Sequence, residues 1–361
     1  MIVPAYNRAR LTLRAIRSAL DQTYADLEVI VVDDGSTDGT REAVAGVGDE
    51  RVRYVWQENS GLPAARNRGM AEARGEFFAF LDSDDAWLPA KIEAQLSALL
   101  AFPGSGMVWT DFSTVDDAGN LLDERHLTTM YTAYVYVDRE RDFAEKRLLG
   151  RIWPGCPAHL AEASCYAGDM YAGMFMGNLA HDSTVLITRE RQQAIGEFDV
   201  AFDPGYEFFL RACGRGDVVF VDAPLALYRM GADDQMSAPG RLAPSARASL
   251  AAVHKALAGD DAAGLISKRM VRERLAVNYG WLGREEFFED RRAARRHLRV
   301  AAFASGPLID RSAQAHACVL WILSFFPSGA LRGVRRARRW LDAAARLAAR
   351  RGTGAPAGDK S

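Results

Sequence analysis

The chain has 361 residues, of which 49% are hydrophobic and 25% are charged, and its formal net charge is −2. This composition is typical of a globular protein with one large domain or two smaller ones. The near-neutral charge gives no signal for binding polyanions, which argues against nucleic acid as a partner. The four cysteines lack the spacing of a zinc or redox site, so we expect a reducing, cytoplasmic location.

Residues 1–112 alternate between short apolar runs and amphipathic segments. The expected strands are residues 2–3, 29–32, 52–55, 77–81 and 107–110, and the expected helices are residues 11–20, 37–47, 63–73 and 89–102. Alternation of this kind predicts an α/β fold, with a Rossmann-type, mostly parallel sheet flanked by helices.

Residues 113–180 are less regular, and we expect them to be an insertion that forms part of a substrate cleft. Regularity returns after it: residues 183–187 and 218–221 read as strands, and residues 189–195 and 206–213 as helices. A helical C-terminal region is predicted over residues 241–351, followed by a disordered tail at 352–361.

The apolar stretch at residues 315–326 is too short to span a bilayer. Five arginines lie close behind it, at positions 332, 335, 336, 338 and 339. A basic segment beside an apolar one can lie on an anionic membrane surface, so residues 315–351 are a candidate for peripheral contact with the inner face of the cytoplasmic membrane. The alternative is compositional, because this chain uses Arg in place of Lys almost throughout.

Two carboxylate clusters follow predicted strands. Asp33 and Asp34 come directly after residues 29–32, and the acidic run at 82–85 comes directly after residues 77–81. Ligands of α/β sheets bind beyond the carboxyl ends of the strands. An Asp-x-Asp at that place suits Mn²⁺ or Mg²⁺ together with a phosphate-bearing substrate. The alternatives are a polar turn for the first cluster and a helix N-cap for the second, although three carboxylates in four positions exceed what a cap needs.

Four segments in this order resemble the family 2 glycosyltransferases, which use nucleotide-sugar donors on a GT-A fold. They are residues 3–8 (VPAYNR), 31–38 (VVDDGSTD), 59–69 (NSGLPAARNRG) and 80–85 (FLDSDD). The resemblance implies a GT-A-like domain over residues 1–240. Residues 1–112 would be its nucleotide-sugar-binding half, and residues 113–240 its acceptor half.

The resemblance also implies roles for individual residues. The nucleotide-sugar site would consist of Pro4, Ala5, Tyr6, Asp33, Asp34, Arg66, Asp82 and Ser83. Asp34 would accept a hydrogen bond from the imide of uracil, and Arg66 would reach the base or the phosphates. Asp84, with Asp82 nearby, would bind Mn²⁺ or Mg²⁺, which would neutralise charge on the leaving diphosphate. For Arg66 the alternative is a solvated helix residue, and for His181, which adjoins Asp182, a histidine without a catalytic role.

An inverting member of this family needs a general base to take the proton of the acceptor hydroxyl. That base is usually an Asp in a Glu-Asp-aromatic-Asp run at the start of a helix. Here the matching residues are 204–207 (PGYE), so Gly205 stands at the base position. Asp203 and Glu207 are the catalytic candidates, and Asp203 is preferred. The Tyr-Arg-x-His segment of the family is also altered, because its histidine is replaced by Gly231.

These features predict an inverting, metal-dependent glycosyltransferase that moves a sugar from a UDP-sugar, or a related nucleotide sugar, to a hydroxyl of a glycan or lipid-linked acceptor. The expected role is in cell-surface polysaccharide synthesis. The alternative is a catalytically impaired nucleotide-sugar-binding homologue that acts as a partner or regulatory subunit, because Gly205 replaces the expected base. A phosphohydrolase is disfavoured, because such enzymes normally take their nucleophile from the first strand, which here leads to Pro4, Ala5 and Tyr6.

Overall fold

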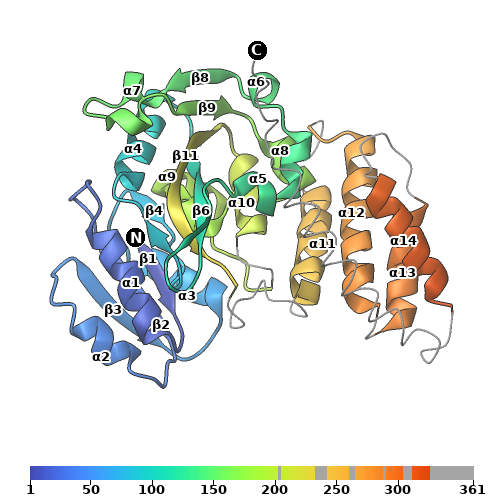
Figure 1. Cartoon of the computed structure of the whole chain (residues 1–361), viewed down its shortest axis with the longest axis horizontal. Helices are drawn as coiled ribbons and strands as arrows, with labels where there is room; N and C mark the ends of the chain where they lie inside the picture. Colours follow the sequence, from blue (N-terminus) through green and yellow to red (C-terminus); the bar gives the residue numbers. More distant parts are fainter. Residues whose placement is uncertain (202–204, 232–241, 260–264, 288–289, 304–310, 326–361) are drawn as a thin grey trace, which may run out of the picture. The chain divides into compact units, whose positions relative to one another are not determined.

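The computed structural model describes residues 1–201, 205–231, 242–259, 265–287, 290–303 and 311–325 (Figure 1). The chain divides into two compact units, Met1–Asn278 and Tyr279–Ser361. The first unit contains both sheets of the described chain.

The first sheet has the order β1-β2-β3 and is parallel (Figure 1). Its strands are β1 (Ile2–Ala5), β2 (Val29–Asp34) and β3 (Val52–Gln57), and the connecting helices are α1 (Ala9–Leu20) and α2 (Thr40–Ala45). The β-branched residues that predicted β1 and β2 are buried, as expected for a sheet covered on both faces. A parallel bridge between Ile2 and Phe80 places β4 (Phe77–Ala79) on the free side of β1. Helix α3 (Leu62–Glu72) connects β3 to β4.

The second sheet has the order β4-β10-β6-β11-β9-β8, with β5 paired to β11 and β7 paired to β6. Its further strands are β5 (Ala86–Trp87), β6 (Met107–Val115), β7 (Leu121–Asp123), β8 (Glu145–Leu148), β9 (Ser164–Gly168), β10 (Leu186–Thr188) and β11 (Val218–Arg229). Strands β4 and β6 are both antiparallel to β10, so they run in the same direction, and β11 is parallel to β6.

The predicted α/β class and its parallel-rich sheet are therefore confirmed. Several strands of the second sheet, including β10 inside it and β9 toward its edge, are antiparallel to their neighbours. The strand expected at residues 183–187 is displaced, because Asp182–Thr184 forms a 3-10 turn (η3) and β10 begins at Leu186. The strands expected at 107–110 and 218–221 are correct but longer, since they run on as β6 and β11.

Short elements fill the insertion between β6 and β10. They are α5 (Leu127–Met130), η1 (Thr132–Tyr136), α6 (Arg139–Asp142), α7 (Leu149–Ile152), η2 (Ala158–Leu160) and α8 (Tyr171–Met176). The longer helices α4 (Lys91–Ala101), α9 (Arg189–Ile195) and α10 (Tyr206–Cys213) lie where the sequence predicts them.

The C-terminal helices are α11 (Leu242–Ala258), α12 (Lys268–Glu286), α13 (Arg291–Ala302) and α14 (Arg311–Leu323). Helix α11 belongs to the first compact unit, and α12 crosses the boundary between the units. Helices α13 and α14 pack against each other through a small core that includes Leu298 and Ala317.

Among the helices that the structure describes, none combines the length and apolar character needed to cross a bilayer. The five arginines at 332–339 and the tail at 352–361 lie outside the described residues. Peripheral membrane contact through residues 315–351 therefore stays a prediction.

Gly69 lets α3 pack closely on β1. A Cβ placed at Gly69 would lie 3.1 Å from Cγ1 of Ile2 and closer still to its Cγ2. Ile2 is fully buried, so its side chain has no free space into which it can move. Gly69 thus has a packing role in the contact between α3 and β1.

We expect Gly69→Ala to lower the free energy of unfolding by about 1–3 kcal/mol, the usual cost of overfilling a packed core. Urea unfolding followed by circular dichroism measures this change. Gly39→Ala is the matched control, because φ at Gly39 is −77° and nothing lies within 4 Å of an added Cβ. This control should leave stability unchanged or raise it by up to about 1 kcal/mol. Equal effects of the two substitutions would contradict the packing role.

Candidate functional site

The predicted site residues come together at the carboxyl ends of β1, β2 and β4. The loop after β1 is joined to the loop after β2, because the backbone N–H of Asn7 donates to Oγ of Ser36 at 2.9 Å and Thr37 N–H donates to Oδ1 of Asn7 at 2.8 Å. Pro4 and Ala5 are buried, whereas Tyr6 is 50% exposed. Only the tyrosine of this trio therefore presents its side chain to solvent.

Asp33 and Asp34 are both buried, and each holds a neighbouring loop. Asp33 accepts hydrogen bonds from Ser36 N–H at 2.8 Å and from the Tyr54 hydroxyl at 2.6 Å. Asp34 accepts from the backbone N–H groups of Ser60 at 2.9 Å and Gly61 at 2.8 Å. Asp34 also accepts from Nε2 of Gln57 at 2.7 Å. A carboxylate has about four acceptor positions, so Asp34 keeps about one for a ligand while fixing the loop that leads into α3.

Arg66 is fully buried and joins two carboxylates. Its Nη2 contacts Oδ1 of Asp82 at 2.7 Å, and its Nη1 contacts Oδ1 of Asp182 at 3.0 Å. The guanidinium also lies over the rings of Phe80 and Phe198, at 5.8 and 5.4 Å from their centroids. Burial alone would lower the pKa of Arg66, but the two carboxylates outweigh this effect and raise it. Arg66 thus faces the predicted site rather than open solvent, and Asp182 joins the site through it.

Asp84 lies between two further arginines. Its Oδ2 contacts Nη1 of Arg8 at 2.9 Å and Nη2 of Arg229 at 3.1 Å. Arg8 follows β1, and Arg229 ends β11, where its other Nη contacts Asp117 at 2.9 Å. Neither arginine is among the predicted site residues. Arg8 stands in the VPAYNR segment and Arg229 in the segment that matches Tyr-Arg-x-His, so their positions in these family segments are the sequence feature that points to them.

Asp85, the last residue of the acidic run, is buried, and so is His181. Asp85 accepts from the Ser183 hydroxyl at 2.5 Å and from the backbone N–H of Arg229 at 3.3 Å. Burial first, and then the charges of Asp84 and Asp82, raise the pKa of Asp85. His181 packs between the rings of Phe112 and Tyr228, at 5.0 and 4.9 Å between centroids.

Asp82 and Asp84 supply carboxylate oxygens, the ligands that Mg²⁺ and Mn²⁺ prefer. Within the described part of the chain, no group of three or more His, Cys, Asp or Glu side chains is placed to hold a metal ion. An ion of this kind is usually bound through one or two carboxylates together with substrate phosphates and water. The two carboxylates therefore fit an ion that a bound diphosphate helps to hold.

Of the two predicted catalytic residues, Asp203 lies outside the described residues. Glu207 stands in α10 and is buried. Its Oε1 contacts Nε of Arg211 at 2.7 Å and Nζ of Lys255 at 2.9 Å. A role for Glu207 as general base stays a prediction. Its carboxylate is already paired with the two cations Arg211 and Lys255.

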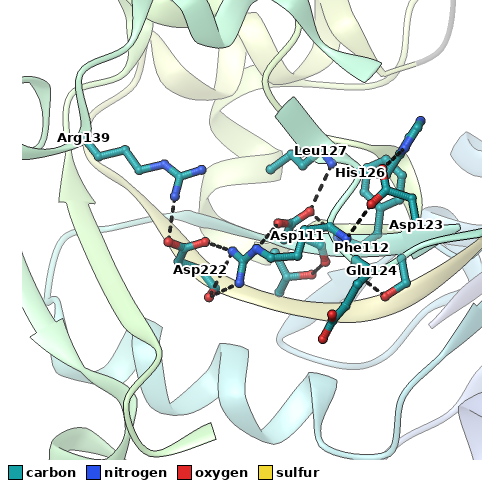
Figure 2. A network of polar contacts seen from close by, with 11 residues as sticks. Asp111, Phe112, Asp123, Glu124, His126, Leu127, Arg139 and Asp222 are labelled. Atoms are coloured by element: carbon teal, nitrogen blue, oxygen red, sulfur yellow. Dashed lines mark hydrogen bonds and ion pairs between the residues drawn. The ribbon is translucent and has the colours of Figure 1, made fainter. Parts of the chain in front are cut away.

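A separate polar network fixes the start of the insertion on the second sheet. Figure 2 shows Arg139 reaching Asp222, with 2.6 Å between Nη1 and Oδ2. Asp111 accepts from the backbone N–H groups of Phe112 at 2.8 Å and Leu127 at 3.1 Å. Arg125 contacts both Asp111 and Asp222. These contacts tie β6 and β11 to the segment that leads into η1, and so position the predicted acceptor half.

Residues 1–160 match the sequence model named Glycosyl transferase family 2. The putative teichuronic acid biosynthesis glycosyltransferase TuaG of Bacillus subtilis is 39% identical over 127 residues, which are 34% of this chain and 50% of TuaG. WfgD of Escherichia coli, a UDP-Glc:alpha-D-GlcNAc-diphosphoundecaprenol beta-1,3-glucosyltransferase, is 43% identical over 101 residues, 28% of this chain and 40% of WfgD. The matched segments thus span half or less of these relatives.

The fold is similar to two solved structures. S. aureus TarS 1–349 in complex with UDP aligns with a TM-score of 0.51 and 15% identity, covering 90% of this chain and 88% of that one. The mannosyltransferase PcManGT from Pyrobaculum calidifontis, in complex with GDP-Man and Mn²⁺, aligns with a TM-score of 0.51 and 19% identity, covering 90% and 79%. The predicted GT-A-like fold and the resemblance seen in the sequence are both confirmed.

The environment of His181 makes stability depend on pH. Burial lowers the pKa of His181 from 6.5 to about 4, so its ring is neutral in the folded protein at pH 7. Between these values the unfolded chain binds more protons at His181 than the folded chain does. The free energy of unfolding should therefore rise with pH through this window, by on the order of 3 kcal/mol, and His181 should add no slope above it.

His181→Gln should remove this rise, which urea unfolding at a series of pH values through the same window measures. The quantity to compare is the difference between wild type and variant at each pH, since groups remote from His181 titrate equally in both. A difference that does not change with pH would contradict the assignment.

Proposed function

Because residues 1–160 match the sequence model of glycosyl transferase family 2, we propose that the protein transfers a sugar from a UDP-sugar, or a related nucleotide sugar, to a hydroxyl of a glycan or lipid-linked acceptor. The proposed setting is cell-surface polysaccharide synthesis in the cytoplasm. The names of TuaG and WfgD support this setting, and the UDP in the TarS structure supports the class of donor.

The charge pattern at the carboxyl ends of the strands is the observation that carries this proposal. Two partly exposed carboxylates, Asp82 and Asp84, are each paired with arginine, and the three arginines come from separate segments of the chain. A nucleoside diphosphate needs cationic groups for its phosphates and a bridging cation for its oxygens. Arg8 and Arg229 would bind the diphosphate, and Asp84, which they release, would hold the cation together with Asp82.

Asp82 and Asp84 would hold Mn²⁺ or Mg²⁺. When bound, the ion would neutralise charge that develops on the leaving nucleoside diphosphate. The base of the nucleotide would lie along Tyr6, which is the exposed side chain after β1. Asp34 would accept from the uracil imide through its remaining acceptor capacity.

We propose direct displacement with inversion at the anomeric carbon. Fully buried Arg66 would position the site by holding Asp82 toward the diphosphate. The alternative, a homologue that binds the donor without turnover, is favoured by one observation, the glycine at position 205. Donor binding without release of nucleotide would select that alternative.

The test is calorimetric titration of the protein with UDP and with GDP, in Mn²⁺ and then in EDTA. Wild type should bind one nucleotide at least tenfold more tightly with the metal. Asp84→Asn should abolish this difference, and its metal-free affinity should hold or increase, because Arg8 and Arg229 lose their carboxylate partner.

Asp26→Asn is the matched control, because it makes the same change at an exposed carboxylate that precedes β2, at the opposite end of that strand from Asp33 and Asp34. It should retain the full effect of the metal. A wild-type protein that binds neither nucleotide would contradict the proposed function. Binding that is indifferent to metal in wild type would contradict the role of Asp84.

A further inference from the structure

The carboxylate of Asp182 occupies the space beside Gly205 in which a side chain would otherwise lie. A Cβ placed at Gly205 would be 2.9 Å from Cγ and 3.0 Å from Oδ2 of Asp182, and closer still to Oδ1. The backbone of Gly205 has φ of +107°, a region that favours glycine. The chain therefore has a carboxylate at this point of the fold, but it is supplied by η3 and not by the residue that precedes α10.

Two features hold the Asp182 carboxylate in place. Its Oδ1 accepts from Nη1 of Arg66 at 3.0 Å, and Arg66 in turn contacts Asp82 at the end of β4. It also lies beside Gly205, the N-cap residue of α10, where the helix dipole favours a negative charge. The guanidinium and the helix terminus both favour the ionised carboxylate, which is the form able to accept a proton.

We propose that Asp182 is the general base of the transfer, in the position that Gly205 leaves open. This inference rests on the proposed function. The acceptor oxygen forms a bond to the anomeric carbon, while the bond from that carbon to the diphosphate oxygen breaks and its electron pair leaves with the nucleoside diphosphate. The proton of the acceptor hydroxyl passes to Asp182 and is later released to solvent, so the step is balanced and involves no redox change.

Three other carboxylates of this part of the fold, Glu207, Asp199 and Asp85, are less suited to this role. Glu207 is 5% exposed in its side chain and contacts Arg211 and Lys255, and Asp199 contacts the same lysine at 2.8 Å. Asp85 is buried and its pKa is raised, which opposes the ionised form that a base needs. The Asp182 side chain is 18% exposed and shares its guanidinium partner with a predicted donor-site carboxylate.

The test compares two nucleophiles that differ in whether they carry a proton. Water must lose a proton when it attacks a UDP-sugar, whereas azide is an anion with no proton to lose. Release of UDP from UDP-glucose and from UDP-GlcNAc is measured with water alone and with added azide, in wild type, Asp182→Asn and Asp182→Glu. Titration with UDP and thermal unfolding show whether each variant keeps its donor site and its fold.

Loss of a general base costs about 10²–10⁴-fold in rate. We therefore expect Asp182→Asn to lose at least 100-fold in the water reaction, to stay within tenfold of wild type with azide, and to bind UDP unchanged. Asp182→Glu keeps a carboxylate and should retain part of the water reaction. The Asp26→Asn control should behave as wild type with both nucleophiles.

Equal losses with water and azide would show that Asp182 acts only through the structure, which would overturn the proposal. Loss in Asp203→Asn but not in Asp182→Asn would assign the base to Asp203 and would also overturn it. A wild-type protein that binds no nucleotide, or that releases none with either nucleophile, would overturn the proposed function and this inference together. Unchanged water-dependent release in Asp182→Asn would overturn this inference alone.

Discussion

The buried guanidinium of Arg66 is the constraint on which the rest of the site depends. A charge without solvent contact is tolerated only where it is paired and hydrogen-bonded. Arg66 meets this condition with Asp82 at the end of β4 and Asp182 in η3. Asp82 and Asp182 are far apart in the sequence. Because both contact the same planar guanidinium, Arg66 fixes the distance between the two carboxylates.

The same logic governs the other charges at this edge of the sheets. Asp84 is shared by Arg8 and Arg229, which stand at the ends of β1 and β11. Without a ligand, the carboxylates and arginines neutralise each other. The proposed substrate, a diphosphate with a metal ion, would replace these ion pairs with new ones: the arginines would pair with the phosphates and the carboxylates with the metal ion, so little rearrangement of charge would be needed.

The sequence predicted what depends on local pattern. Apolar runs that end at Asp correctly predicted β2 and β4, and with them the positions of the two carboxylate clusters. The residue pattern of 63–73 correctly predicted α3, which contains Arg66. It did not predict the antiparallel direction of β10, because a short apolar run carries no information about direction. It identified Gly205 as a departure from the family but not the carboxylate beside it, because Asp182 comes beside Gly205 only in the folded chain, 23 positions away in sequence.

Lys255 shows that helix α11 is electrostatically coupled to the residues around α10. This residue of α11 contacts Asp199 and Glu207, one on each side of the segment that leads into α10. A fragment that ended where the second sheet ends, at residue 240, would lack this cation and would leave buried Glu207 with less compensation for its charge. Helix α11 therefore contributes to the electrostatics of the first compact unit, to which it belongs.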